Sequence, residues 1–238
     1  MEKQEINYVF DIDGTLTPAR LPIEAVFKTF FLEWIQNKKV YLITGSDYEK
    51  SVEQIGPEIL EAVTACFNTA GNICYKKGKV IYRNDWSAPP DLIHLLNQFI
   101  ENSKHPIRAG RHFEHRIGML NFSIVGRNCT REQRNDYNLY DAEVKEREYF
   151  CKTIMEQFPE IEATVGGQIS IDIYALGMNK AQIIKHIKGP IHFFGDKTKE
   201  GENDYAIAKK LTKLPNRVFT VKDWKETMEI LKQYNRNS

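Results

Sequence analysis

Short apolar runs alternate with helical segments at both ends of the chain, and this alternation limits the fold more than any other feature. The runs INYVF at 6–10 and VYLITG at 40–45 flank a segment at 24–39 whose large apolar residues share one helical face. The last third repeats the pattern. It predicts strands at IHFFGD and RVFTV, and helices at NKAQIIKHIKG, ENDYAIAKKL and KDWKETMEILKQYN. Such apolar strands joined by helices predict a parallel sheet that is covered on both faces.

The middle of the chain has a different pattern. The segments at 92–103 and 141–158 predict helices, and MLNFSIVG at 119–126 and GGQISIDIY at 166–174 alternate polar with apolar residues. This alternation is typical of antiparallel strands, so the middle predicts an antiparallel sheet with helices on one side.

Together the two patterns predict an α/β protein with an insertion. We expect a doubly wound, Rossmann-like core domain formed by residues 1–80 and 179–238, and an inserted α+β cap domain over residues 81–178.

Charge and composition exclude several classes of partner. The 238 residues include 33 Lys and Arg against 32 Asp and Glu, a net charge of +1, so no overall field attracts nucleic acid or an anionic membrane. No apolar run approaches the length of a membrane span, and we expect a cytoplasmic enzyme. The four cysteines form no CxxC pair and predict reduced, structural thiols.

Polar residues follow three of the predicted parallel strands. Asp11 and Asp13 come after the first strand, Thr44 and Ser46 after the second, and Asp196 after IHFF. In parallel α/β sheets, ligands bind beyond the carboxyl ends of the strands. Asp beside Gly is also ordinary turn chemistry, but acids and a hydroxyl at neighbouring strand ends favour a shared site.

Acids that converge in this way repel one another unless a cation joins them. Carboxylate oxygens suit Mg²⁺, which binds proteins through one or two carboxylates together with a substrate phosphate. One carboxylate of the first pair could then attack phosphorus, and the other could exchange a proton with the alcohol. Lys180 could supply positive charge for the phosphoryl oxygens, although a single Lys at a helix start is more often a solvated surface charge.

DIDGTLT, TGS, Lys180 and GDKTKEGEND resemble, in this order, the four motifs of the haloacid dehalogenase superfamily of phosphotransferases. The resemblance implies that Asp11 is the nucleophile and Asp13 the acid/base. It further implies a phosphate-binding hydroxyl from Thr44 or Ser46, Lys180 as charge partner, and a Mg²⁺ site among Asp11, Asp13, Asp196, Asn203 and Asp204.

The middle segment carries groups that suit a phosphosugar. Arg116, Arg127 and Arg134 surround a predicted strand and the turn after it, and arginine donates paired hydrogen bonds to phosphate. Any one of them could be a solvated surface charge. Their combination with Ser170 and Asp172, which alternate on one strand, favours a pocket for phosphate and hydroxyl groups.

Longer strings resemble the eukaryotic-type phosphomannomutases over nearly the whole chain: DGTLT, GSDYEK, YKKGK, RIGMLNFSIVGR, GGQISID and FFGDKTKEGEND. The resemblance implies a mutase that interconverts hexose 1- and 6-phosphates, with a hexose 1,6-bisphosphate as activator, and a homodimer joined through the cap domains. The implied substrate-binding residues are Arg20, Arg116, Arg127, Arg134, Ser170 and Asp172.

Three segments depart from that family's pattern. Thr44-Gly45-Ser46 replaces Gly-Gly-Ser, GMNK replaces GWDK, and TAGN at 69–72 replaces ENG. The first change is closer to the phosphatase branch of the superfamily, so a sugar-phosphate phosphatase is the alternative function. A phosphosugar-binding protein without activity is a third alternative, which the intact acids disfavour.

Overall fold

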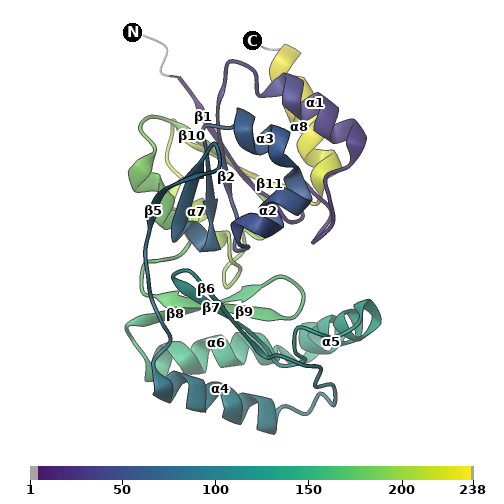
Figure 1. Ribbon diagram of the computed structural model, residues 1–238, viewed down its shortest axis with the longest axis vertical. Coiled ribbons are helices and arrows are strands. Elements are labelled where there is room, and N and C mark those ends of the chain that lie inside the picture. The colour runs from purple at the N-terminus through teal and green to yellow at the C-terminus, as the bar shows by residue number, and fades with distance from the viewer. Residues whose placement is uncertain (1–4, 237–238) are drawn as a thin grey trace. The chain divides into compact units, whose positions relative to one another are not determined.

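The computed structural model describes residues 5–236, which form two compact units (Figure 1). The first unit comprises the residues up to Arg83, Lys180–Glu200, and the residues from Asp204 onwards. The second unit comprises Asn84–Asn179 and Gly201–Asn203. The described part of the chain contains no helix that is long and apolar enough to cross a membrane.

A seven-stranded sheet organises the first unit, in the order β11-β10-β1-β2-β3-β4-β5. The first five of these strands are parallel, whereas β4 pairs antiparallel with both β3 and β5, and β5 forms the edge of the sheet. The strands are β1 (Asn7–Asp11), β2 (Lys39–Ile43), β3 (Ala65–Asn68), β4 (Ile73–Lys76), β5 (Lys79–Arg83), β10 (Ile191–Gly195) and β11 (Arg217–Thr220).

Helices cover both faces of this sheet, as the apolar strands predicted. Along β1, Tyr8 and Phe10 pack with α1, α3 and α8, whereas Val9 packs on the other face with η2 and α7. The helices are α1 (Ala25–Trp34), α2 (Tyr48–Ile55), α3 (Pro57–Ala62), α7 (Tyr205–Lys210) and α8 (Trp224–Arg236), with the 3₁₀ helices η1 (Thr69–Gly71) and η2 (Lys180–His186).

The order of the strands reverses next to β1. From β1 the chain proceeds outward through β2 and β3, and it later returns to place β10 and then β11 on the other side of β1. Such a reversal leaves a crevice at the carboxyl ends of the central strands, where α/β proteins bind their ligands. Asp11 is the last residue of β1, and Asp196 directly follows β10.

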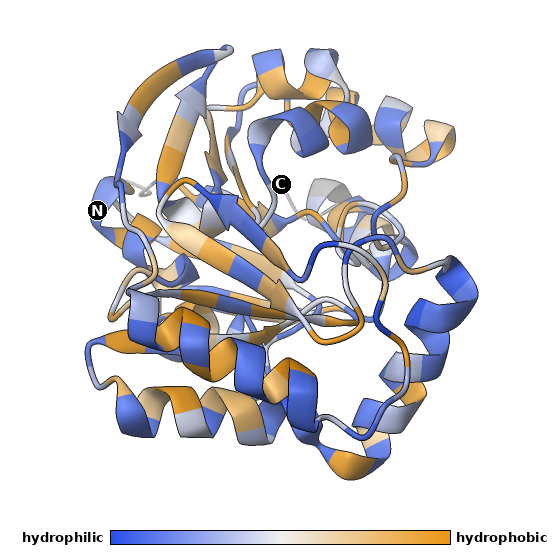
Figure 2. Ribbon diagram, turned by 60° about the horizontal axis from the view of Figure 1, so that its bottom comes forward, coloured by the Kyte–Doolittle hydropathy of each residue, from blue (hydrophilic) through white to orange (hydrophobic). Residues whose placement is uncertain are grey.

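The second unit contains a four-stranded antiparallel sheet in the order β6-β7-β9-β8. Its core joins this sheet to helices on which polar and apolar residues alternate (Figure 2). The elements are α4 (Pro90–Asn102), β6 (Phe113–Arg116), β7 (Met119–Ser123), α5 (Arg131–Val144), α6 (Glu146–Gln157), β8 (Ile161–Gly166) and β9 (Ser170–Ala175).

Two predicted helices were wrong in detail. The helix predicted at 141–158 is divided between α5 and α6, because Lys145 adopts a left-handed conformation and the Asp141 carboxylate accepts a hydrogen bond from the backbone N–H of Arg147. NKAQIIKHIKG forms the 3₁₀ helix η2. Four consecutive residues at its start, 180–183, are buried, and the single apolar face of a surface α-helix does not bury four residues in a row.

A buried ion pair fixes the junction between α5 and α6. Arg147 Nε lies 2.8 Å from Asp141 Oδ2, and Arg147 Nη1 donates to the carbonyl oxygens of Gly166 and Ser170 at 2.9 and 3.2 Å. Both charged side chains are buried. The arginine therefore ties the helix junction to the turn that joins β8 to β9 and begins with Gly166.

We expect Asp141→Ala to destabilise the protein by about 3–5 kcal/mol, because Arg147 would remain buried without its counter-charge. Urea unfolding measures the change. Glu156→Gln, which breaks an exposed pair with Lys152, is the control and should cost roughly 0.5 kcal/mol or less. Equal effects of the two substitutions would contradict the structural role of the buried pair.

Candidate active site

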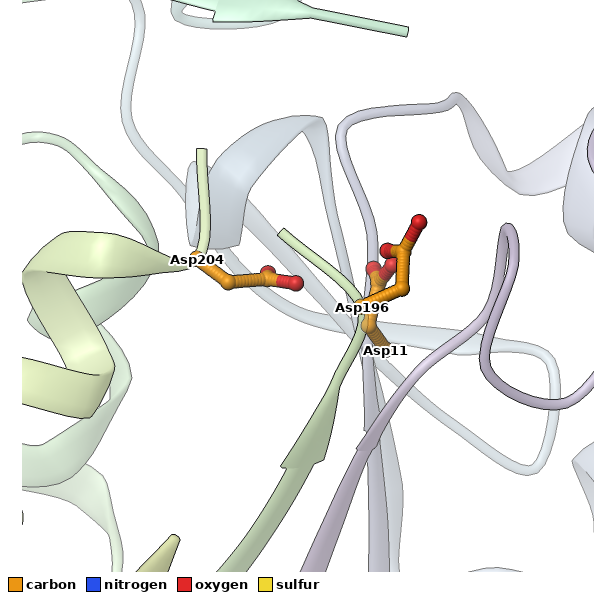
Figure 3. Close-up of side chains that lie close together, drawn as sticks. All are labelled: Asp11, Asp196 and Asp204. Carbon is orange, nitrogen blue, oxygen red and sulfur yellow. The ribbon is translucent and has the colours of Figure 1, made fainter. Parts of the chain in front are cut away.

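Three carboxylates meet at the carboxyl end of the parallel sheet. Asp11 ends β1, Asp196 follows β10, and Asp204 directly precedes α7. One carboxylate oxygen from each lies within 4.8 Å of the other two (Figure 3). Asp11 and Asp204 are buried, and Asp196 is half-buried. The ends of β1 and β10 and the start of α7 thus bring Asp11 together with two acids that lie far from it in the sequence.

A buried lysine joins two of these acids. Lys180 is the first residue of η2, and its Nζ lies 2.6 Å from Asp11 Oδ1 and 2.7 Å from Asp204 Oδ1. Its side chain is only 2 % exposed. Despite burial, the two carboxylates raise the pKa of Lys180 above its usual value, so this side chain is an ammonium at neutral pH. It is therefore not the solvated surface charge that a lysine at a helix start usually is.

The cluster carries more negative charge than its lysine balances. Three carboxylates and one ammonium leave two negative charges in a largely buried place. Burial raises the pKa of Asp11 well above its usual value, and burial together with Asp204 raises that of Asp196 to about 7. A divalent cation would supply the missing positive charge.

The donor set fits a hard divalent cation. Asp196 Oδ1 is buried and accepts no hydrogen bond from the described residues, and the same holds for Oδ1 of Asn203. Asp204 already accepts from Lys180 at Oδ1 and from the backbone N–H of Lys197 at Oδ2. Free carboxylate and amide oxygens are the ligands that Mg²⁺ prefers. Asp196 is therefore open to a cation, whereas Asp204 holds Lys180.

Gly14 allows the acids to approach β1. Its φ is +79°, and a Cβ at this position would collide with the carboxylate of Asp196. The glycine of the DxDGT string thus serves the acid cluster as well as the turn.

Asp13 lies outside the three-acid cluster and has partners of its own. Its Oδ1 accepts from the backbone N–H of Arg20 at 2.6 Å and from Gln54 Nε2 at 2.9 Å. Asp11 and Asp13 therefore have different surroundings, which supports different tasks. The Arg20 residue is exposed. Gln54 was missed by the sequence analysis, because a glutamine within a helix gives no chemical signal.

The hydroxyl-bearing residues after β2 form a tight turn. Thr44 is buried, and its Oγ1 accepts from the backbone N–H of Ser46 at 3.1 Å. Ser46 is half-buried and precedes α2, which Asp47 caps by accepting from the N–H of Lys50. The acceptor role of Thr44 leaves its own proton available to a further partner.

A second polar cluster lies within the second unit. Arg127 Nη1 donates to Asn121 Oδ1 at 3.0 Å and to Ser170 Oγ at 3.1 Å, and Asn121 Nδ2 donates to Asp172 Oδ1 at 2.6 Å. Asn121 pairs with Asp172 and Ser123 with Ser170 across β7 and β9, so these alternating polar residues share one face of the sheet.

Glu114 holds two of the predicted arginines. Its Oε1 lies 2.6 Å from Arg116 Nη2, and its Oε2 lies 2.7 Å from Arg127 Nε. Burial alone would raise the pKa of Glu114, but the two guanidinium groups outweigh it and lower that pKa. The alternation of Glu114 and Arg116 along β6 was the signal that could have revealed this pair. Arg134 lies at the start of α5 and is half-buried.

The parallel sheet with its strand-order reversal, the inserted antiparallel unit and the acid cluster with its buried lysine define a member of the haloacid dehalogenase superfamily. Among solved structures with this fold, a protein of Streptococcus mutans UA159 superimposes with a TM-score of 0.65. It is 14% identical and covers 98% of this chain and 100% of its own.

The family model of eukaryotic phosphomannomutase matches residues 27–233, and the chain belongs to this family. The chain is 34% identical to a phosphomannomutase of Drosophila melanogaster, with 94% of each chain covered. It is 37% identical to a phosphomannomutase of Saccharomyces cerevisiae, with 87% of this chain and 86% of that protein covered.

We expect added MgCl₂ to raise the Tm, by roughly 5–10 °C at a concentration about 100 times the Kd. The rise should be smaller at pH 6 than at pH 8, because Asp196, with a pKa of about 7, is protonated at the lower pH and the cation must displace that proton. Thermal denaturation at the two pH values measures this difference.

Two variants control this experiment. Asp196→Asn should lose most of the response to Mg²⁺, whereas Glu229→Gln, an exposed acid on α8, should retain it. A full response in Asp196→Asn, or equal responses of the native protein at both pH values, would contradict the assignment of the cation to this cluster.

Proposed function

We propose that the protein is a phosphomannomutase that interconverts mannose 1-phosphate and mannose 6-phosphate through a phosphorylated Asp11 and a hexose 1,6-bisphosphate. In this function, residues 1–80 and 179–238 form the catalytic domain and residues 81–178 form the cap. The observation that carries it is the arginine cluster of the second unit, since a mutase must bind a second phosphate and a simple phosphatase need not.

In the proposed mechanism, Asp11 attacks a phosphorus atom of the bound hexose 1,6-bisphosphate, and a hexose monophosphate leaves with the oxygen that was bonded to that phosphorus. Lys180 holds Asp11 Oδ1 at 2.6 Å, which leaves Oδ2 as the attacking oxygen. The same ammonium stabilises the negative charge that develops on the phosphoryl oxygens. Asp11, Asp13, Asp196, Asn203 and Asp204 would hold a Mg²⁺ ion, which would supply further positive charge for the phosphoryl group, and the open oxygen of Asp196 supports this proposal.

Asp13 is the proposed acid and base of both half-reactions. It takes a proton from the hydroxyl of the hexose monophosphate that attacks the phosphorylated Asp11. After the resulting bisphosphate has turned around, it gives a proton to the sugar oxygen that leaves phosphorus. A hydroxyl of Thr44 or Ser46 donates to the transferring phosphoryl group. Because the sugar turns around between the halves, a hexose 1,6-bisphosphate is both the intermediate and the activator that phosphorylates the resting enzyme.

The remaining substrate contacts come from six residues. Arginine forks bind the phosphate that is not being transferred, and the small polar groups bind sugar hydroxyls. These residues are Arg20, Arg116, Arg127, Arg134, Ser170 and Asp172. The hydrogen bonds of Arg127 to Asn121 and Ser170 support this assignment, since they orient the guanidinium group before any ligand binds.

We further propose a cytoplasmic homodimer joined through the cap domains. The exposed apolar side chains of Leu139 and Val144 on α5 and of Tyr149 on α6 support an interface on these helices. The four cysteines are free thiols, which suits a reducing compartment.

The sugar-phosphate phosphatase is the second candidate function, favoured by the Thr44-Gly45-Ser46 sequence. An assay with Mg²⁺, mannose 1-phosphate and a trace of glucose 1,6-bisphosphate separates the candidates. We expect mannose 6-phosphate as the main product and little free phosphate. Stoichiometric free phosphate without 6-phosphate would establish the phosphatase instead, and absence of both products would indicate a binding protein. Asp11→Asn should abolish either activity while the circular dichroism spectrum stays unchanged.

Arg127→Ala should lower kcat/KM of the mutase reaction roughly 10- to 100-fold, as expected for loss of a charged hydrogen bond to phosphate. Hydrolysis of 4-nitrophenyl phosphate, which has no second phosphate, should change less than about threefold, by the usual effect of a distant substitution. Arg131→Ala, an exposed arginine on α5, is the control. Equal losses with both substrates would argue against a second phosphate site at Arg127.

A further inference from the structure

One oxygen of Asp13 is held by two donors, and the other is open. Oδ1 accepts from the Arg20 backbone N–H at 2.6 Å and from Gln54 Nε2 at 2.9 Å. Within residues 5–236, Oδ2 of Asp13 accepts no hydrogen bond. A carboxylate that is fixed through one oxygen presents its other oxygen in a defined direction.

Gln54 comes from a separate element and is itself fixed. It lies near the end of α2 and is 1 % exposed. Its Nε2 also faces Thr17 Oγ1 at 3.3 Å, and its backbone carbonyl accepts from the N–H of Ile23 at 2.7 Å. Asp13, Thr17 and Ile23 belong to the segment that follows β1, so Gln54 connects α2 to this whole segment.

The side-chain amide of Gln54 lowers the stability of the fold. Its Oε1 is buried and finds no partner among the described residues, and a buried unpaired carbonyl destabilises a fold. An apolar side chain of the same size would avoid this cost. The retained amide therefore indicates a role for its N–H group, and the acceptor that this group meets at the shortest distance is Asp13 Oδ1.

We infer that Gln54 is a positioning residue for Asp13: it holds Oδ1 so that Oδ2 exchanges the proton with the sugar oxygen. This inference rests on the proposed role of Asp13 as acid and base. When the bond between phosphorus and the sugar oxygen breaks, the proton on Asp13 Oδ2 moves to that oxygen and Asp13 becomes a carboxylate. In the reverse half, the sugar hydroxyl returns a proton to Oδ2 as its oxygen bonds to phosphorus.

The test compares two leaving groups in Gln54→Met, which keeps the length and shape of the side chain but removes the donor. Turnover of mannose 1-phosphate should fall about 10- to 100-fold through kcat, with KM changed less than about twofold, since proton transfer contributes 10²–10⁴-fold. Phosphorylation of Asp11 by 4-nitrophenyl phosphate, measured as a burst of 4-nitrophenolate, should keep its rate within about threefold, because this leaving group departs without a proton.

Three further variants make the result interpretable. Gln36→Met repeats the substitution at an exposed glutamine of the same unit and should change neither rate. Gln54→Glu keeps the shape of the side chain but replaces the donor to Asp13 by a carboxylate oxygen, which cannot donate. Like Gln54→Met, it should slow turnover of mannose 1-phosphate but not the reaction with 4-nitrophenyl phosphate. Asp13→Asn is measured in parallel and should show the largest split between the two leaving groups.

The outcomes separate the two proposals. If Asp13→Asn slows both leaving groups equally, the role of Asp13 in the proposed function is wrong. If Asp13→Asn shows the split while both Gln54 variants lose both reactions equally, or lose neither, Gln54 serves only the fold or has no role, and the inference alone is overturned. A fall in both reactions is the expected result of a displaced segment after β1, because Gly14 lies in this segment and Asp11 directly precedes it.

Discussion

The contact of Lys180 with Asp11 and Asp204 is the interaction on which the rest of the structure depends. Lys180 and Asp11 are 169 residues apart in the sequence, yet Nζ and Oδ1 lie 2.6 Å apart in the interior. An ammonium buried in this way is stable only beside carboxylates, so β1, η2 and the start of α7 must meet at one point. This requirement explains why both ends of the chain build one sheet, with β10 returning to lie beside β1.

The same contact leaves a charge that the protein alone does not balance. Lys180 compensates one of three acids, and burial together with the neighbouring carboxylates raises the pKa of Asp11 and of Asp196. A site of this kind gains stability from a cation, because each added positive charge relieves repulsion between carboxylates. The excess negative charge is thus a means of binding a divalent ion firmly, at the cost of the stability of the empty protein.

The positions of the strands in the sequence predicted two of the three clustered acids, Asp11 and Asp196, whereas Asp204 was expected only from the family resemblance and Asp13 lies outside the cluster. Apolar runs mark parallel strands, and an acid directly after such a run lies at the carboxyl edge of the sheet, as Asp11 and Asp196 do. The partners of Asp13 and of the arginines were not predictable in this way. Gln54 acts from a helix, and Glu114 on β6 pairs with Arg127, which follows β7, so both interactions depend on contacts between elements. The break at Lys145 was missed because the residue is not a glycine, although its φ is +57°.

Two of the departures from the family's pattern, Thr44-Gly45-Ser46 and TAGN at 69–72, are in contact in the structure. The backbone N–H of Ala70 donates to the carbonyl oxygen of Thr44, and that of Thr69 donates to Ser46, so TAGN and TGS are joined by hydrogen bonds. Thr69 and Ala70 both have positive φ, and the Thr69 hydroxyl is buried without a partner, so this turn is strained. The two hydrogen bonds fix the backbone carbonyl groups of Thr44 and Ser46 against this turn. The two departures are therefore structurally coupled: a substitution at Thr44 changes a residue that is hydrogen-bonded to the turn at Thr69 and Ala70.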